Sequence, residues 1–260
     1  MTVVLVLGMH RSGTSCLAGA LQAAGLDAGE VVESAPFNPK GNRENLRIRA
    51  LNDAVLEASG GSWRRQPRHL QWQPEHEEER GRIIAEFNAR TDHWMFKDPR
   101  TVLTLDFWRA ADVGVEFVGT FRHPSAVVAS LQQRAIDSSD PQLDIATDEA
   151  LHLWLQHNRV IADLRRRGAF PLICFDSPPS EYLDSLKDAI GWLQTKIDAR
   201  PPLQPEEAAR IFDLRLIRQS PPSARASSEA AFRSELMEAA EALYSELSKM
   251  TGRDGPNPTS

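Results

Sequence analysis

The start of the chain contains the feature that most constrains its fold. Residues 3–7 form an uninterrupted run of valine and leucine, and the glycine-containing segment 8–15 follows directly. Apolar residues then recur at helical spacing over residues 17–24. A buried strand, a loop and a helix in this order predict the first unit of a parallel α/β sheet. The loop amides at such a helix N-terminus point outward and can bind an anion.

The remainder of the chain repeats this alternation of strand and helix patterns. Short apolar runs typical of buried strands cover residues 93–96, 115–121 and 170–175. Helical patterns cover about 43–59, 75–91, 146–167 and 232–250. The alternation predicts an α/β fold with a P-loop-type, doubly wound parallel sheet, in three layers with helical insertions. We expect one domain over residues 1–250 and a loose tail over 251–260.

Composition limits the cellular setting and the partners. The formal net charge is -6, which argues against nucleic acid or an anionic membrane as the main partner. Cys16 and Cys174 are far apart in sequence, so they predict neither a disulfide framework nor a paired metal site, and a cytoplasmic location is expected. The first residues lack a basic leader, and no stretch reaches the roughly 18 apolar residues of a membrane helix. We therefore expect no membrane span and no Golgi-type anchor.

The loop over residues 8–15 differs from a nucleotide P-loop in its cation. Gly8 and Gly13 have the G-x-x-x-x-G spacing, but the next residues are Thr14 and Ser15 instead of Lys followed by Ser or Thr. Arg11 supplies a cation inside the loop instead. The loop is therefore predicted to bind phosphate or sulfate oxygens with a different arrangement of charge.

Other catalytic classes are disfavoured by the same segments. A magnesium-dependent NTPase requires an acidic residue at the end of a neighbouring strand, whereas the 115–121 run ends at Arg122. Ser12 has His10 and Thr14 where a G-x-S-x-G hydrolase has glycines. The histidines form neither an HExxH nor a Cys/His pattern, so we expect no dedicated metal site.

Three segments in order resemble the sulfotransferase family, and in particular its bacterial branch. They are Gly8-Met-His-Arg-Ser-Gly-Thr-Ser15, Lys97-Asp-Pro-Arg100, and Arg122-His-Pro followed by Ser130-Leu-Gln-Gln-Arg134. The resemblance extends over residues 1–176. It implies a co-substrate, 3′-phosphoadenosine-5′-phosphosulfate (PAPS), and a product, 3′-phosphoadenosine-5′-phosphate (PAP), with no metal.

The resemblance also implies which residues bind the co-substrate. The 5′-phosphosulfate would be held by Arg11, Ser12, Gly13, Thr14 and Ser15, and the 3′-phosphate by Arg122 and Ser130. The chain departs from the cytosolic eukaryotic enzymes at Cys16, where they have a stacking tryptophan, and it lacks their carboxyl-terminal R-K-G segment. The adenine contacts therefore stay open. Arg218 is either a replacement for the missing cation or a surface arginine.

The expected chemistry is an in-line displacement at sulfur, in which the protein positions the donor, stabilises charge and deprotonates the acceptor. Arg11 and Lys97 are predicted to stabilise the sulfuryl and leaving-group oxygens. Glu44 matches an N-x-x-G-x-x-E segment of the bacterial branch and is the predicted base. Asp98 and His10 are reserve candidates. Structural alternatives are a Lys97–Asp98 salt bridge, Glu44 at a helix start, Asp98 shaping a turn and His10 contacting the loop backbone.

The resulting prediction is transfer of a sulfuryl group to a hydroxyl or amine of a small-molecule, carbohydrate or lipid acceptor. Two alternatives remain, a P-loop kinase and a catalytically silent nucleotide-binding protein of the same fold. The arginine- and tryptophan-containing loop over residues 62–74 is either a wall for an acidic or aromatic acceptor or a solvated surface loop. A homodimer is possible.

Overall fold

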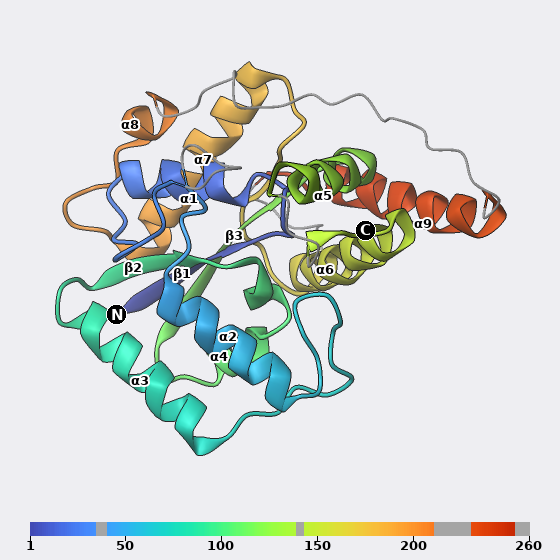
Figure 1. Ribbon diagram of the computed structural model, residues 1–260. Helices are drawn as coiled ribbons and strands as arrows, with labels where there is room; N and C mark the ends of the chain where they lie inside the picture. The colour runs from blue at the N-terminus through green and yellow to red at the C-terminus, as the bar shows by residue number, and fades with distance from the viewer. Residues whose placement is uncertain (35–40, 139–142, 211–229, 253–260) are drawn as a thin grey trace.

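A computed structural model describes residues 1–34, 41–138, 143–210 and 230–252. Within these residues, four parallel strands form one sheet in the order β2-β1-β3-β4. The strands are β1 (Thr2–Leu7), β2 (His93–Lys97), β3 (Gly114–Phe121) and β4 (Leu172–Cys174). Helices cover both faces of the sheet (Figure 1), which confirms the predicted three-layer α/β class.

The side-chain alternation of β1 creates two separate apolar cores. Val4 and Val6 pack on one face with α1, α7 and α8, whereas Leu5 and Leu7 pack on the other face with the remaining helices. The helices are α1 (Thr14–Ala23), α2 (Leu46–Ala58), α3 (Pro74–Asn88), α4 (Leu105–Arg109), α5 (Pro124–Ser138), α6 (Thr147–Arg167), α7 (Pro179–Ile197), α8 (Pro205–Arg210) and α9 (Ala230–Lys249), with a 3-10 turn η1 (Pro99–Val102).

All four strands are parallel, so the connections that leave them begin at the same edge of the sheet. The chain passes from β1 to β2 on one side and then returns to β3 on the other side of β1. Val6 is level with Lys97 on β2, and Leu7 is level with Gly119 on β3. The segments that follow the strands therefore meet around the carboxyl end of β1, where doubly wound sheets bind their ligands.

The predicted elements agree with the structure within a few residues, with two differences. The last strand is short, although Phe175 still donates its backbone N–H to the carbonyl of Phe121 at 2.8 Å. In the stretch expected to be loose, Gly252 pairs with Leu172 through hydrogen bonds of 3.1 and 3.3 Å. The segment 253–260 lies outside the described residues, as do 35–40 and Arg218. Of the helices in the described part, none has the length and apolar character needed to cross a membrane.

Candidate anion-binding and transfer site

The loop between β1 and α1 depends on two glycines. Gly13 precedes the first helical residue with φ +88°, and a Cβ atom on it would lie 2.2 Å from the Phe175 ring. A Cβ on Gly8 would lie 2.7 Å from the carbonyl oxygen of Thr120. Both approaches are too close for any side chain, so the loop can pack against the carboxyl ends of β3 and β4 only with glycine at these positions.

The N-terminus of α1 has the features of an anion site. Its first-turn amides have no partner within the helix, and the N-cap residue, Gly13, has no side chain to cap them. The first turn contains no acidic residue, so the positive end of the helix is not neutralised there. Ser12 is fully buried, and its Oγ has no hydrogen-bond partner among the described residues. An unsatisfied hydroxyl beside a helix N-terminus favours a ligand with acceptor oxygens.

The second predicted phosphate motif lies directly against this loop. Arg11 Nε donates a hydrogen bond to Ser130 Oγ at 2.9 Å, across 119 positions of sequence. Arg122 Nη1 donates to the carbonyl oxygen of Arg11 at 3.5 Å. The loop and the Arg122–Ser130 segment were predicted separately, and the fold brings them together because β3 is the neighbour of β1 and α5 begins immediately after β3.

Several contacts fix the position of Arg122. Its Nε lies 3.3 Å from Asp176 Oδ1, and the backbone N–H of His123 donates to the other carboxylate oxygen. The indole of Trp154 donates to the Arg122 carbonyl at 2.9 Å. Asp176 was missed in the sequence analysis, although an acidic residue directly after the fourth strand is a signal that could have indicated it.

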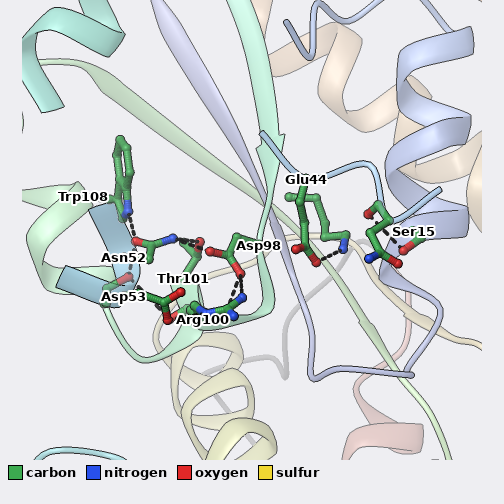
Figure 2. A network of polar contacts seen from close by, with 11 residues as sticks. Ser15, Glu44, Asn52, Asp53, Asp98, Arg100, Thr101 and Trp108 are labelled. Atoms are coloured by element: carbon green, nitrogen blue, oxygen red, sulfur yellow. Dashed lines mark hydrogen bonds and ion pairs between the residues drawn. The ribbon is translucent and has the colours of Figure 1, made fainter. Parts of the chain in front are cut away.

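Lys97 and Glu44 form a buried ion pair at 2.7 Å beside the loop (Figure 2). The segment carrying Glu44 is held against α1 because Ser15 Oγ donates to the carbonyl oxygen of Asn42 at 3.1 Å. The partner of Lys97 is thus Glu44, where the sequence alternative was Asp98. Asn45 caps α2, its side chain accepting from the amides of the first turn, so Glu44 itself does not serve as the cap.

Asp98 belongs to a different cluster, shown in Figure 2, that joins η1 to α2. Its carboxylate accepts from Asn52 Nδ2 at 2.9 Å and from Arg100 Nη1 at 3.0 Å, and Arg100 Nε lies 2.6 Å from Asp53. The carbonyl oxygen of the Asn52 side chain accepts from Thr104 and Trp108. Burial raises the pKa of Asp98. These contacts correspond to the turn-shaping alternative for this residue.

His10 packs in a cluster of aromatic and basic side chains. Its ring centroid lies 5.1 Å from that of Trp63 and 6.4 Å from that of His157 on α6. The guanidinium groups of Arg64 and Arg134 lie 4.9 and 5.6 Å from the Trp63 ring. The arginine- and tryptophan-containing loop therefore reaches the loop between β1 and α1 through the contact of Trp63 with His10. His157 gave no signal in the sequence, because a histidine on an amphipathic helix carries no indication of its partners.

Both histidines are kept neutral by their surroundings. Burial, and then the positive charges of Arg100 and Arg134, hold the pKa of His10 well below its ordinary value. Burial lowers the pKa of His157 to about 4. Neutral imidazoles are proton acceptors at physiological pH. Within the described part of the chain, no three His, Cys, Asp or Glu side chains are grouped so as to hold a metal ion.

Comparison with known proteins gives one structural likeness. No family model matches the chain, and no curated protein matches it. Among solved structures, the sulfotransferase domain of the Synechococcus PCC 7002 olefin synthase is similar, with 17% sequence identity, 94% of each chain covered and a TM-score of 0.43.

Proposed function

We propose that the chain is a sulfotransferase that moves a sulfuryl group from PAPS to a hydroxyl or amine of a small-molecule, carbohydrate or lipid acceptor. The contact between Arg11 and Ser130 carries the proposal, because it joins two motifs whose sequences resemble the two ends of a PAPS site. A reducing cytoplasm is the proposed location and suits Cys16 and Cys174, which form no disulfide.

The proposed donor site divides its charges between two ends. The α1 amides, Ser12 and Arg11 would bind the phosphosulfate, and Arg122 with Ser130 would bind the 3′-phosphate. Lys97 ends β2 beside the loop and would stabilise the oxygens of the sulfuryl and leaving groups. Glu44 holds the Lys97 ammonium in place through their 2.7 Å contact. None of these roles requires a lysine in the loop. A P-loop kinase would require one, and the loop of this chain does not contain it.

Calorimetric titration with PAP in metal-free buffer tests the proposal. Wild type should bind, and Arg11→Asn and Arg122→Ala should each weaken binding by about 10- to 100-fold, the value of a lost charge-assisted hydrogen bond. Asparagine is chosen for position 11 because it tolerates the positive φ of 67° found there. Arg166→Ala is the matched control, since Arg166 is an exposed arginine of α6.

The outcomes distinguish the alternatives. Failure of PAP to bind, or binding of ATP only in the presence of magnesium, would contradict the sulfotransferase proposal and favour a kinase. PAP binding without release of PAP from PAPS, over a panel of sugars, phenols, amines and lipids, would indicate a silent nucleotide-binding protein.

A further inference from the structure

Two buried imidazole nitrogens beside the proposed donor site are unsatisfied. The Nε2 atoms of His10 and His157 are both shielded from solvent, and neither has a hydrogen-bond partner among the described residues. A buried polar atom without a partner costs about 1–3 kcal/mol. Two such atoms on neighbouring rings therefore indicate that something else binds there in the working protein.

The protonation of His157 is set by its backbone contact. Its Nδ1 lies 2.9 Å from the carbonyl oxygen of Leu153, the residue one helical turn earlier. A carbonyl only accepts hydrogen bonds, so Nδ1 carries the proton of the neutral ring and Nε2 is left as an acceptor. The missing partner of His157 is therefore a donor, such as the hydroxyl of an acceptor substrate.

His10 lies in the same loop as the residues proposed to bind the donor. It directly precedes Arg11 in the loop proposed to bind the phosphosulfate, and its ring packs on Trp63 and faces His157. The carboxylate of Glu44 is already committed to Lys97 at 2.7 Å. Protonation of Glu44 would leave the buried Lys97 ammonium without its counter-charge, which is costly in a site of this depth.

We propose that His10 is the proton acceptor of the transfer, and that binding of the anionic donor prepares it for this role. The inference rests on the proposed function. The acceptor oxygen forms a bond to sulfur while the bond from sulfur to the bridging phosphate oxygen breaks, and that oxygen leaves with the electron pair as PAP. The hydroxyl proton moves to Nε2 of His10. His157 Nε2 accepts a hydrogen bond from a second O–H or N–H group of the acceptor substrate and positions it.

The charges around His10 explain the preparation step. Burial lowers the pKa of His10 most, and the charged or titratable groups Arg100, Arg134, His157 and Lys97 lower it further. Asp98 and Asp53 partly neutralise Arg100, and Glu44 partly neutralises Lys97. Phosphate and sulfate charges bound at Arg11 act in the opposite direction and raise the pKa of His10. Donor binding thereby increases the basicity of His10 when it is needed.

Proton uptake on PAP binding provides the deciding test. Calorimetry in buffers of different ionisation enthalpy, between about pH 5.5 and 7, should show that the wild type takes up protons when PAP binds. His10→Gln should lose part of this uptake, and its PAP affinity should therefore change less with pH than that of the wild type. For each unit by which PAP raises the pKa of His10, the change of wild-type affinity with pH should be larger by about tenfold. His69→Gln, at an exposed position, should behave as wild type.

Two controls make the comparison specific. The phosphates of PAP titrate in the same range in every variant. The contribution of His10 is therefore measured as the difference in proton uptake between His10→Gln and His69→Gln. His10→Asn serves as a second variant if His10→Gln folds poorly. Slow conversion of PAPS to PAP with water as acceptor should fall by about 100-fold in kcat in His10→Gln, with KM nearly unchanged.

The inference and the proposed function fail differently. Intact PAP binding with equal proton uptake in wild type, His10→Gln and His69→Gln would overturn the role of His10 and leave the sulfotransferase proposal in place. Absence of PAP binding in the wild type would overturn both.

Discussion

Two neighbouring residues, Lys97 and Asp98, enter two buried polar clusters that differ in how well they are satisfied. On the side of Asp98, the side chains that join η1 to α2 provide each other with donors and acceptors. On the side of Lys97, the loop between β1 and α1 has the unsatisfied Ser12 Oγ and His10 Nε2 among the described residues. A complete network holds a fold together, whereas an incomplete one at the carboxyl edge of a sheet indicates a ligand site.

The largest effect should come from the complete network. Asp98→Ala removes one of the two carboxylates in contact with the guanidinium of Arg100 among the described residues, and this side chain is 12% exposed. We expect the free energy of unfolding in urea to fall by about 3–5 kcal/mol. Asp163→Ala, at an exposed ion pair, should cost less than about 1 kcal/mol. If Asp98→Ala kept near-normal stability but lost PAPS turnover, Asp98 would be a catalytic residue. The contrast between the two clusters would then be wrong.

The free energy of unfolding should depend on pH because the buried histidines are neutral in the folded chain. The pKa of His157 is lowered to about 4 in the folded chain, whereas an unfolded histidine has a pKa of about 6.5. Between these values the unfolded state binds more protons, so the free energy of unfolding falls as the pH decreases from about 6.5 to 4. The contribution of His157 to this fall is about 3 kcal/mol.

His157→Gln should therefore flatten the pH dependence of the urea midpoint over that range. Some dependence should remain, because the pKa of His10 is lowered too. An unchanged profile would mean that His157 is protonated in the folded chain and cannot serve as a hydrogen-bond acceptor for the substrate.

Substitution of Gly13 should show that close packing, and not backbone conformation alone, requires glycine in the loop between β1 and α1. Gly13→Ala places a methyl group against the Phe175 ring at a positive φ, and should cost about 2–3 kcal/mol in the free energy of unfolding. Gly60→Ala has a comparable φ of +68° but no atom within 4 Å of the new Cβ, and should cost about 1 kcal/mol. Equal costs for the two variants would contradict the role of the Phe175 contact.

The smallest effect should come from the contact between the two motifs. Ser130→Ala removes the acceptor of the Arg11 hydrogen bond and a proposed ligand of the 3′-phosphate, so PAP affinity should fall about tenfold. Its stability should change by less than about 1 kcal/mol. Ser248→Ala removes a serine whose hydroxyl donates to the carbonyl of Tyr244 within its own helix, and should leave PAP affinity unchanged. If the two variants bound PAP with similar affinity, Ser130 would not be part of the proposed donor site.

The sequence was sufficient for the parts of the site that depend on local pattern. The strand, the glycine spacing and the start of α1 follow from residues that are adjacent in the chain, and the limits predicted for α2, α3, α6 and α9 agree within a few residues for the same reason. Arg11, Arg122 and Ser130 could be predicted as site residues because their motifs are short and ordered, and their roles stay predictions. Asp176 and His157 could not, since each makes its contact with a partner distant in sequence.

The amino-acid sequence by itself determined the α/β class and the positions of the motifs proposed to bind the donor, because hydrophobic period and glycine spacing are local properties of the chain. The tertiary structure alone decided which polar groups are paired. It directed Lys97 toward Glu44 and Asp98 toward Asn52, although the two residues are adjacent, because successive residues at a strand end point to different surroundings. It also decided that His10 and His157 meet in a buried site, where long-range packing and desolvation set their protonation.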